Sequence, residues 1–186
     1  MKIKTIEIAG LAGALTALRL PFGKEVRSVI RSDHNVIDRD GESRFDSETR
    51  IWIADKDLTL MTTLVKRGDE HAKVVRGIMV WARIKAPVYF TRELETYRAG
   101  RERLSSSSTM HQECQGLSGE ELQRAKAELP MGTEQNFVDV YSYQTLRRIV
   151  AQRHNHRLPE WHTFIDWIRT LPYAEELIFV GLETEE

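Results

Sequence analysis

One stretch of the sequence limits the possible folds more than any other, the segment 77–86, which reads GIMVWARIKA. Every even-numbered position from Ile78 to Ala86 is apolar, while Trp81 and Arg83 stand at odd-numbered positions between them. This period of two is typical of a strand with one face against a core. The segment is therefore predicted to be a strand in a half-buried sheet.

The residues after this strand predict a helix, because the spacing of the apolar residues changes at Pro87. Proline is favoured at the first position of a helix. Phe90, Leu94 and Tyr97 then recur at the spacing of one helical face. Residues 101–110 contain four consecutive serines beside basic residues, and we interpret them as a loop or a short strand.

The other apolar patterns divide into one more strand and several amphipathic helices. Residues 2–8 alternate isoleucine with charged residues and predict a strand. Ser142 is expected to be the N-cap of a helix whose buried face carries Leu146, Ile149 and Val150. Further helices are predicted from Gly10 to Leu18, from Leu58 to Gly68, over 120–129 and from Trp161 to Pro172. The mixture indicates an α+β fold.

The length and composition suit one soluble domain. Of 186 residues, 41% are hydrophobic and 30% charged, a balance typical of globular proteins. We expect a single domain over 1–186, with a loop or lid at 31–49 and a polar connector at 112–136. The single cysteine, Cys114, cannot form an internal disulfide, which favours a reducing compartment, the cytoplasm. Glu7 interrupts the apolar N-terminal stretch, so no signal peptide or membrane span is expected.

The charge balance argues against a protein that binds extended nucleic acid. Lys and Arg number 27 and Asp and Glu number 28, which gives a formal net charge of −1, so no overall field attracts a polyanion. Arginines do cluster within 98–103 and within 147–157. Each cluster suits the phosphate of a small ligand, but a cluster of this kind viewed alone is more often an ordinary solvated face.

The most specific signal is the run from Ile84 to Thr109, IKAPVYFTRELETYRAGRERLSSSST. In order and spacing it resembles the central signature of the flavin-dependent thymidylate synthases. There a strand ends in a Lys-Ala-Pro or Lys-Cys-Pro step, followed by an Arg-Gln pair, an Arg-His-Arg triplet and a serine-containing segment that ends near an Arg-Tyr pair. On this register Arg92 and Glu93 take the first pair, Thr96, Tyr97 and Arg98 the triplet, Ser106 the serine associated with the nucleotide, and Ser108 and Thr109 the Arg-Tyr positions.

The triplet departs from the family pattern at two of its three positions. Tyr97 can stack on a ring and Thr96 can hydrogen-bond, but Thr96 lacks the guanidinium that would bind a phosphate in bidentate fashion. That loss corresponds to about a tenfold to hundredfold change in affinity, which Arg101 or Arg103 could offset. The Phe-Glu-His element that precedes the strand in the family is not found, since 73–77 reads KVVRG.

A second block, residues 145–161, reads TLRRIVAQRHNHRLPEW and resembles the C-terminal part of the same family. There an Asn-Ala-Arg step precedes a helix ending in Leu-Arg and an Ala-Gln-x-Glu element. Arg153 aligns with the arginine that addresses the nucleotide, although Pro159 and Glu160 replace much of the family's next element. Arg153 also falls on the apolar face of its predicted helix, where a cation must be paired or line a cavity. A ligand site and a structural salt bridge remain equally open for it.

The resemblance implies a mostly antiparallel sheet packed with helices and a homo-oligomer, a tetramer, with sites between subunits. It also implies FAD as cofactor, with a reduced nicotinamide and a folate as co-substrates. The substrate would be dUMP or a related pyrimidine nucleotide, which undergoes reductive methylation or another one-carbon transfer at the uracil ring. The implied substrate residues are Arg92, Glu93, Ser106, Ser108 and Arg153, the flavin residues are Thr96, Tyr97 and Arg98, and Ser106 is also the catalytic position.

Several alternatives stay open or are weaker. A nucleotide-binding module that senses, sequesters or regulates would keep the fold without the chemistry, and the altered triplet favours it. The serines at 105–108 lack the GxSxG motif and the histidine and acid partners of a hydrolase nucleophile. His154, His156 and His162 are divided by Pro159 and lie on different faces, so no metal site is expected. The four tryptophans are expected to anchor the core or an interface.

Overall fold

The computed structural model describes residues 1–23, 53–108 and 113–182, together with four short strands between them. The short strands form two antiparallel pairs, β2 (Val29–Ile30) with β5 (Ile51–Trp52) and β3 (Val36–Ile37) with β4 (Ser43–Arg44). Apart from β3 and β4, the loop or lid expected at 31–49 lies outside the described residues.

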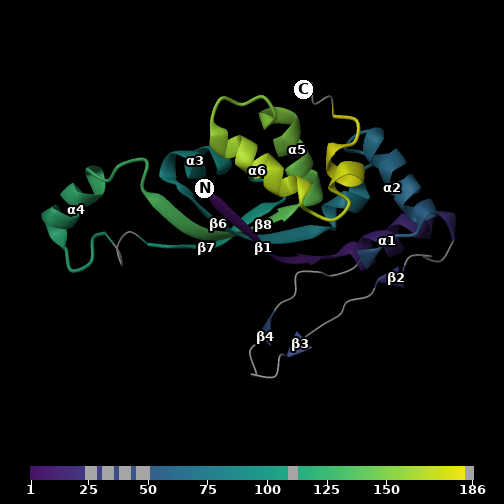
Figure 1. The fold of residues 1–186 in the computed structure, drawn as a ribbon, viewed down its shortest axis with the longest axis horizontal. Coiled ribbons are helices and arrows are strands. Elements are labelled where there is room, and N and C mark those ends of the chain that lie inside the picture. Colours follow the sequence, from purple (N-terminus) through teal and green to yellow (C-terminus); the bar gives the residue numbers. More distant parts are fainter. Residues whose placement is uncertain (24–28, 31–35, 38–42, 45–50, 109–112, 183–186) are drawn as a thin grey trace.

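A four-stranded antiparallel sheet forms the centre of the molecule (Figure 1), in the order β1, β6, β8, β7. The strands are β1 (Lys2–Ala9), β6 (Met79–Pro87), β8 (Glu134–Ser142) and β7 (Arg101–Ser106). The strands predicted at 2–8 and 77–86 are confirmed, and so is the α+β class with an antiparallel sheet. Of the two alternatives for 101–110, the short strand is found as β7.

Strand β8 is the element that the sequence pattern did not predict. Its inward side chains are Phe137, Asp139 and Tyr141, which are buried opposite apolar positions of β6. Valines 138 and 140 occupy the opposite face. Because apolar residues occur on both faces and a carboxylate interrupts the inward set, no period of two is visible in the sequence.

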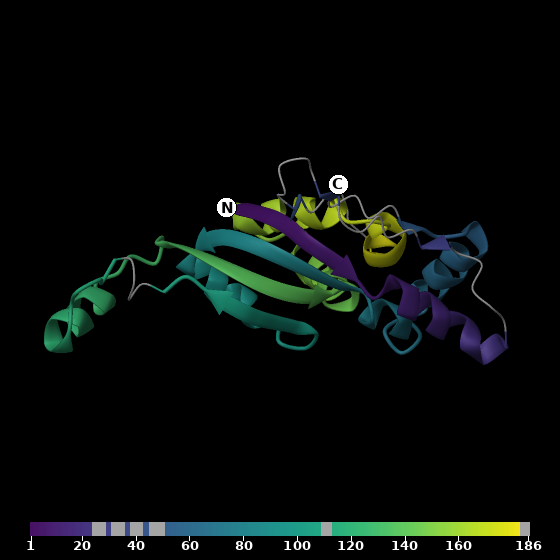
Figure 2. The same ribbon diagram turned by 90° about the horizontal axis from the view of Figure 1, so that it is seen from below.

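One face of the sheet is buried against helices, and β6 shows how its sequence produces this. Val80, Ala82 and Ile84 are fully buried, whereas Arg83 and Lys85 between and beside them are exposed. Successive residues of a strand point to opposite faces, so β6 turns its apolar set toward one layer of helices (Figures 1 and 2). The helices of that layer are α3 (Val88–Leu94), α5 (Tyr143–Arg153) and α6 (Pro159–Arg169).

Aromatic contacts hold α6 against α3 and the sheet. The ring centres of Phe90 and Trp161 are 4.8 Å apart, and those of Tyr141 and Phe164 are 5.7 Å apart, both in edge-to-face geometry. Such pairs add about 0.5–1.5 kcal/mol beyond the area that they bury. Trp161 and Trp167 are buried core residues, in agreement with the prediction for them.

Apart from α4, the remaining helical elements lie mainly beyond one end of the sheet (Figure 1). They are α1 (Leu11–Arg19), α2 (Asp55–Lys66), and the short turns η1 (Leu20–Phe22), η2 (Lys73–Arg76) and η3 (Glu175–Phe179). The predicted N-cap is confirmed, since Ser142 Oγ accepts a hydrogen bond from the Thr145 amide at 3.2 Å. Among the helices in the described ranges, none has both the length and the apolar character needed to cross a membrane.

An arm projects from the body of the molecule and carries α4 (Gly119–Ala127), close to the helix predicted at 120–129 (Figures 1 and 2). We define the arm as residues 113–133. Its base is tied to the start of α3, where the Val88 amide donates to the Thr133 carbonyl and the Tyr89 amide to the Met131 carbonyl, both at 3.0 Å. Helix α4 has no buried residue. The expected polar connector is therefore a structured extension.

A buried carboxylate joins β7 to β8. Asp139 is fully buried, and it accepts hydrogen bonds from Arg101 Nε at 2.8 Å, from Arg103 Nε at 3.0 Å and from the Tyr141 hydroxyl at 2.9 Å. Burial raises the pKa of Tyr141 well above its usual value, which keeps the phenol protonated as a donor. Two guanidinium groups and one phenol thus satisfy this charge.

Asp139→Asn should destabilise the fold by about 3–5 kcal/mol, because it leaves the charge of the Arg101 guanidinium, which is 5% exposed, without a compensating carboxylate. Asp69→Asn is the matched control, since Asp69 pairs with Arg148 at 2.6 Å but both side chains are 42% exposed. An exposed pair contributes about 0–1 kcal/mol. Urea unfolding of both variants measures how far each lowers the free energy of unfolding. If both lower it by the same small amount, the buried pair contributes no more to stability than the exposed one.

Substitution by alanine should change the stability of the fold in opposite directions at Gly10 and at Gly13. Gly10 has φ of 89°, and a methyl group there would overlap the Gly77 carbonyl oxygen, whereas Gly13 has open space around its Cα. Gly10→Ala should cost more than about 1 kcal/mol, while Gly13→Ala, inside α1, should stabilise by about 0.5–1 kcal/mol. Thermal unfolding followed by circular dichroism tests both signs, and a stabilising Gly10→Ala would contradict the close approach to Gly77.

Candidate functional site

The candidate site begins with one side of α3, where Tyr89, Glu93 and Tyr97 follow one another at intervals of four residues. Residues four apart share a helix face. This face is turned toward α5 and α6, since the Tyr89 hydroxyl donates to the Glu160 carboxylate of α6. Glu93 and Tyr97, the latter just beyond the end of α3, reach the end of α5 and the start of α6 in the same way.

Arg153, the last residue of α5, lies against this face. Its Nε donates to the Tyr97 hydroxyl at 2.7 Å, and its Nη1 is 3.7 Å from Glu93 Oε2. The guanidinium carbon also lies 4.8 Å from the centre of the Trp161 ring, a cation–π arrangement. The side chain is 23% exposed. The cation is therefore paired within the chain and still reaches the surface.

Glu93 is the centre of this group because one of its oxygens faces three donors. Its Oε2 accepts from Trp161 Nε1 at 2.9 Å and lies 3.6 Å from His156 Nε2, in addition to the 3.7 Å contact with Arg153. We call Glu93, Tyr97, Arg153, His156 and Trp161 the Arg153 cluster. An anion that displaced the carboxylate would meet the same donors.

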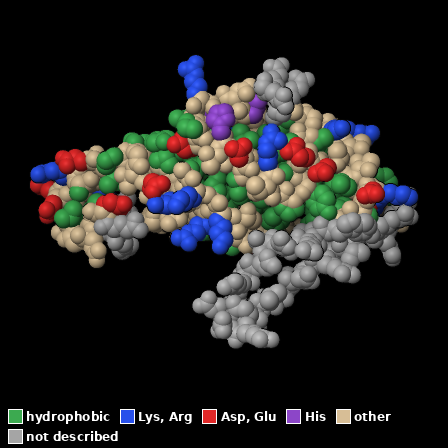
Figure 3. Space-filling model, viewed as in Figure 1, with side chains coloured by type: hydrophobic (Ala, Val, Ile, Leu, Met, Phe, Trp, Pro, Cys, Tyr) green, Lys and Arg blue, Asp and Glu red, His purple; other side chains and the backbone are tan. Residues whose placement is uncertain are grey.

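The surface around the cluster is mixed in charge. Figure 3 shows histidine side chains near α5 and α6 with acidic and basic side chains beside them. Glu93 and His156 are 35% and 26% exposed, so solvent reaches the carboxylate and its neighbours. Ion pairs at such a position are partly screened by water, and their rearrangement on ligand binding is correspondingly easy.

The resemblance to the thymidylate synthases grouped eight residues, and the structure brings three of them together. Glu93, Tyr97 and Arg153 belong to the Arg153 cluster, although they come from two blocks far apart in the sequence. Thr96 lies beside them, but its hydroxyl donates to the Glu93 carbonyl at 2.7 Å and so completes the end of α3.

The other four residues lie outside the cluster. Arg92 and Arg98 are exposed, and within the described part of the chain neither pairs with a carboxylate. Ser106 is exposed at the end of β7, where it lines a hollow together with Arg83. Ser108, two residues further on, is partly buried. Thr109, which the register adds to these eight, lies outside the described residues.

The expectation that Arg101 or Arg103 offsets the missing guanidinium at Thr96 is wrong for Arg101. The Arg101 side chain is 5% exposed and is bound to Asp139 and to the Leu94 carbonyl. Arg103 is engaged as well, since it contacts Asp139 and its Nη1 donates to Glu95 at 2.6 Å. Both guanidinium groups hold β7 to its neighbours.

His156 and Trp161 are members of the cluster that the sequence did not place there. Trp161 is fully buried, as expected of a core residue, yet its indole N–H reaches Glu93. From the sequence, His156 is expected to be an ordinary satisfied or surface histidine. The four-residue interval on α3 indicates a polar helix face from the sequence alone. Which residues this face contacts depends on how α6 crosses α3.

The histidines are engaged in hydrogen bonds with the backbone. His162 Nε2 lies 2.7 Å from the His156 carbonyl, and His154 Nδ1 lies 3.3 Å from the Val150 carbonyl. Within residues 1–23, 53–108 and 113–182, no three His, Cys, Asp or Glu side chains are grouped as metal ligands would be.

Comparison with known proteins gives similarity in structure and none in sequence families. No protein-family model matches the chain, and no curated protein matches it. Among solved structures, thymidylate synthase X (ThyX) from Helicobacter pylori with FAD and dUMP is 13% identical, covers 98% of this chain and 100% of its own, and superposes with a TM-score of 0.70. A second complex of flavin-dependent ThyX from Helicobacter pylori with FAD and dUMP is 12% identical, covering 97% and 99% of the two chains at a TM-score of 0.68.

A third similar structure is a UMP/dUMP methylase, PolB from Streptomyces cacaoi, bound with 5-Br dUMP. It is 12% identical and covers 98% of this chain and 93% of its own, with a TM-score of 0.61. At this identity the agreement establishes the fold. Together with the order of β1, β6, β8 and β7 and the helices on one face, it shows that this chain has the fold of the flavin-dependent thymidylate synthases.

Proposed function

We propose that the protein binds dUMP or a related pyrimidine nucleotide at a site that includes the Arg153 cluster. The observation that carries this proposal is the fold match over 98% of the chain to a protein solved with FAD and dUMP. The meeting of Glu93 and Tyr97 with Arg153 supports it, because both resembling blocks contribute to one solvent-accessible group of polar side chains.

In this proposal the Glu93 carboxylate, before a nucleotide binds, occupies the position that an anionic group of the ligand would take. It is surrounded by Arg153, His156 and Trp161, which are donors suited to a phosphate or a uracil oxygen. A nucleotide would compete with it for Arg153. Glu93 therefore limits the affinity for the nucleotide. At this position the family pattern has glutamine, which carries no charge.

The residues beside the cluster fit part of FAD. Arg98 is an exposed cation without a carboxylate partner in the described residues, which suits a phosphate group. Arg92 is exposed in the same way and is proposed to bind the nucleotide instead. Tyr97 is half-buried at the same place, and Thr96 offers a hydroxyl next to it. Bound flavin would supply hydride for reductive methylation at the uracil ring, with a folate as carbon donor and a reduced nicotinamide as reductant.

A homo-oligomer, a tetramer by resemblance, would complete the site. Ser106 and Ser108 are proposed to hydrogen-bond the nucleotide, with Ser106 also nearest to the reaction. In one chain Ser106 lines a hollow with Arg83 at the sheet, whereas Arg153 lies with Trp161 between helices. A site containing both groups is more readily formed between subunits.

A second function is favoured by a specific observation. Arg153 is already neutralised by Glu93, and Thr96 supplies no guanidinium. Both features weaken the binding of a doubly charged phosphate at the catalytic position. A nucleotide-binding module that senses, sequesters or regulates on the same fold would tolerate them.

Flavin binding separates the two functions. The enzyme should purify with flavin absorbance or take up added FAD, and a reduced nicotinamide should bleach it. A colourless protein that still binds dUMP in calorimetric titration supports the module. A protein that binds neither FAD nor any pyrimidine nucleotide contradicts the proposed function as a whole.

Glu93→Gln should raise the affinity for dUMP about threefold to tenfold, because it removes a competing but partly exposed carboxylate. Arg153→Lys should lower it about tenfold or more by loss of the bidentate donor. Arg157→Lys is the matched control, since Arg157 is exposed and lies just beyond α5. Calorimetric titration measures all three. Unchanged affinity in both Glu93→Gln and Arg153→Lys would remove the cluster from the site.

A further inference from the structure

The side of the sheet turned away from α3, α5 and α6 has an apolar centre, and we call this side of β1, β6, β8 and β7 the open face. Its centre is formed by Trp81 of β6 with Val138 and Val140 of β8, and Trp81 lies directly opposite Val140. Figure 1 places these helices above the sheet, and Figure 2 is seen from the other side. Trp81 and Val138 are half-buried. A large aromatic ring in such a position is typical of an interface.

Exposed apolar residues also stand at both edges of the open face, in the β-bulges of the two edge strands. Ile6 is the extra residue of β1, just before the residue opposite Trp81, and it is 38% exposed. Leu104 is the extra residue of β7, just before the residue opposite Val138, and it is 56% exposed. Both bulges therefore lie at one level of the sheet, that of Ala82 in β6.

Charged side chains of opposite sign lie on the two sides of this level. Glu7 of β1 and Glu102 of β7 stand in the row of Trp81. Lys4 and Arg83 are opposite each other in the row two residues further along β6. All four charged residues are exposed, and none of them has an ion-pair partner within the described residues. Because like charges in opposite positions destabilise an antiparallel pair, carboxylates from outside the chain would offset the repulsion between Lys4 and Arg83.

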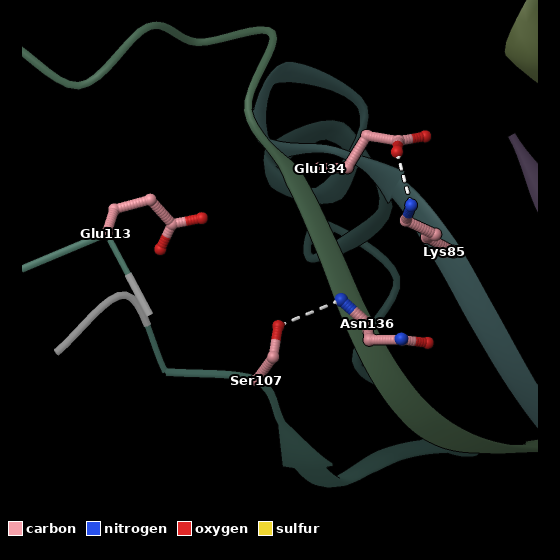
Figure 4. A pocket seen from close by; sticks show the side chains of 5 residues that line it. All are labelled: Lys85, Ser107, Glu113, Glu134 and Asn136. Carbon is pink, nitrogen blue, oxygen red and sulfur yellow. Dashed lines mark hydrogen bonds and ion pairs between the residues drawn. The ribbon is translucent and has the colours of Figure 1, made fainter. Parts of the chain in front are cut away.

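Farther toward the arm, the chain balances its own charges (Figure 4). Lys85 Nζ lies 2.6 Å from Glu134 Oε2, and the hydrogen bond from Lys85 lowers the pKa of that carboxyl, to which Lys2 contributes more weakly. Glu113 lies across a hollow of about 430 Å³ from this pair. Two ammonium groups and two carboxylates therefore offset one another here. The unbalanced charges of the open face are those in the two rows beside its apolar centre.

Two copies of the open face are complementary under one symmetry, a twofold axis that runs across the strands at the level of Ala82. Such an axis reverses the direction of the strands, so it exchanges the row of Trp81 with the row of Arg83. The residues that come to face each other are Glu7 with Lys4, Trp81 with Arg83, Val140 with Val138, and the two bulge residues Ile6 and Leu104 each with its own copy. Ion pairs, cation–π pairs and apolar contacts are thus each formed twice.

The direction of the axis matters for this complementarity. An axis parallel to the strands would place Glu7 of one copy against Glu102 of the other, which are like charges. Sheets that pack face to face lie about 10 Å apart with their strands within about 30° of each other. Long charged side chains can bridge that separation, so the two rows can pair around the apolar centre.

We propose that two copies of this chain meet through their open faces, related by the twofold axis across the strands. The partner is a second copy because the charges of the open face match those of the same face turned round. The contact goes beyond the proposed function, since it needs neither nucleotide nor flavin. The homo-oligomer expected by resemblance leaves open which surfaces of the chain meet.

Analytical ultracentrifugation of charge-reversal variants tests this contact. The wild-type chain should sediment as a dimer or a tetramer. Glu7→Lys puts a lysine against Lys4 of the second copy, and Lys4→Glu puts a glutamate against Glu7, so each variant alone should raise the dissociation constant of the contact about tenfold or more and fall to half the wild-type mass. An equimolar mixture of the two variants should recover the wild-type mass, because each chain supplies the charge that the other lacks.

Glu70→Lys and Lys56→Glu are the matched controls, since both residues are exposed and lie outside the sheet, and they should keep the wild-type mass. Glu7 and Lys4 are exposed as well, so their variants should keep the wild-type melting curve. A monomeric wild-type chain, wild-type mass in either open-face variant, or a mixture that stays at half mass overturns the proposal. Because the readout is mass and needs no ligand, failure to bind dUMP and FAD would contradict the proposed function and leave this contact standing.

Discussion

The antiparallel pairing of β6 with β8 is the interaction on which the other parts of the molecule depend. It runs without a break from Met79 opposite Ser142 to Pro87 opposite Glu134. A slip of one residue would turn Asp139 to the outer face and bring Val138 inward. Asp139 would then lose Arg101 and Arg103, so the buried ion pairs and the apolar row of β6 fix the same register.

The same pairing explains why the Arg153 cluster forms. Each central strand continues directly into a helix, β6 into α3 after Pro87 and β8 into α5 after Ser142. Because the strands are antiparallel, the two helices start from opposite ends of the sheet and run toward each other over its buried face. Tyr97 and Arg153, each at or just beyond the end of its helix, are in contact as a result.

The periodic elements of this fold can be read from the sequence, and the tertiary contacts cannot. Strand β6 and helices α5 and α6 have one apolar stripe each, so their periods are visible. Strand β8 is hidden because Asp139 occupies an inward position that is satisfied only by arginines on another strand. The placement of Arg153 on a buried face was predictable, but the identity of its partners Glu93 and Trp161 depends on the crossing of three helices.

The arm has a consequence for how this chain tolerates change. Strands β7 and β8 are adjacent and antiparallel where the arm begins and ends, and the Ser107 amide still donates to the Asn136 carbonyl at 2.6 Å. Two such strands can be joined by a hairpin turn of a few residues. Since the entropy of closing a connection grows slowly with its length, the segment between them is a natural point of insertion. Whole modules could be exchanged there without altering the register of the sheet.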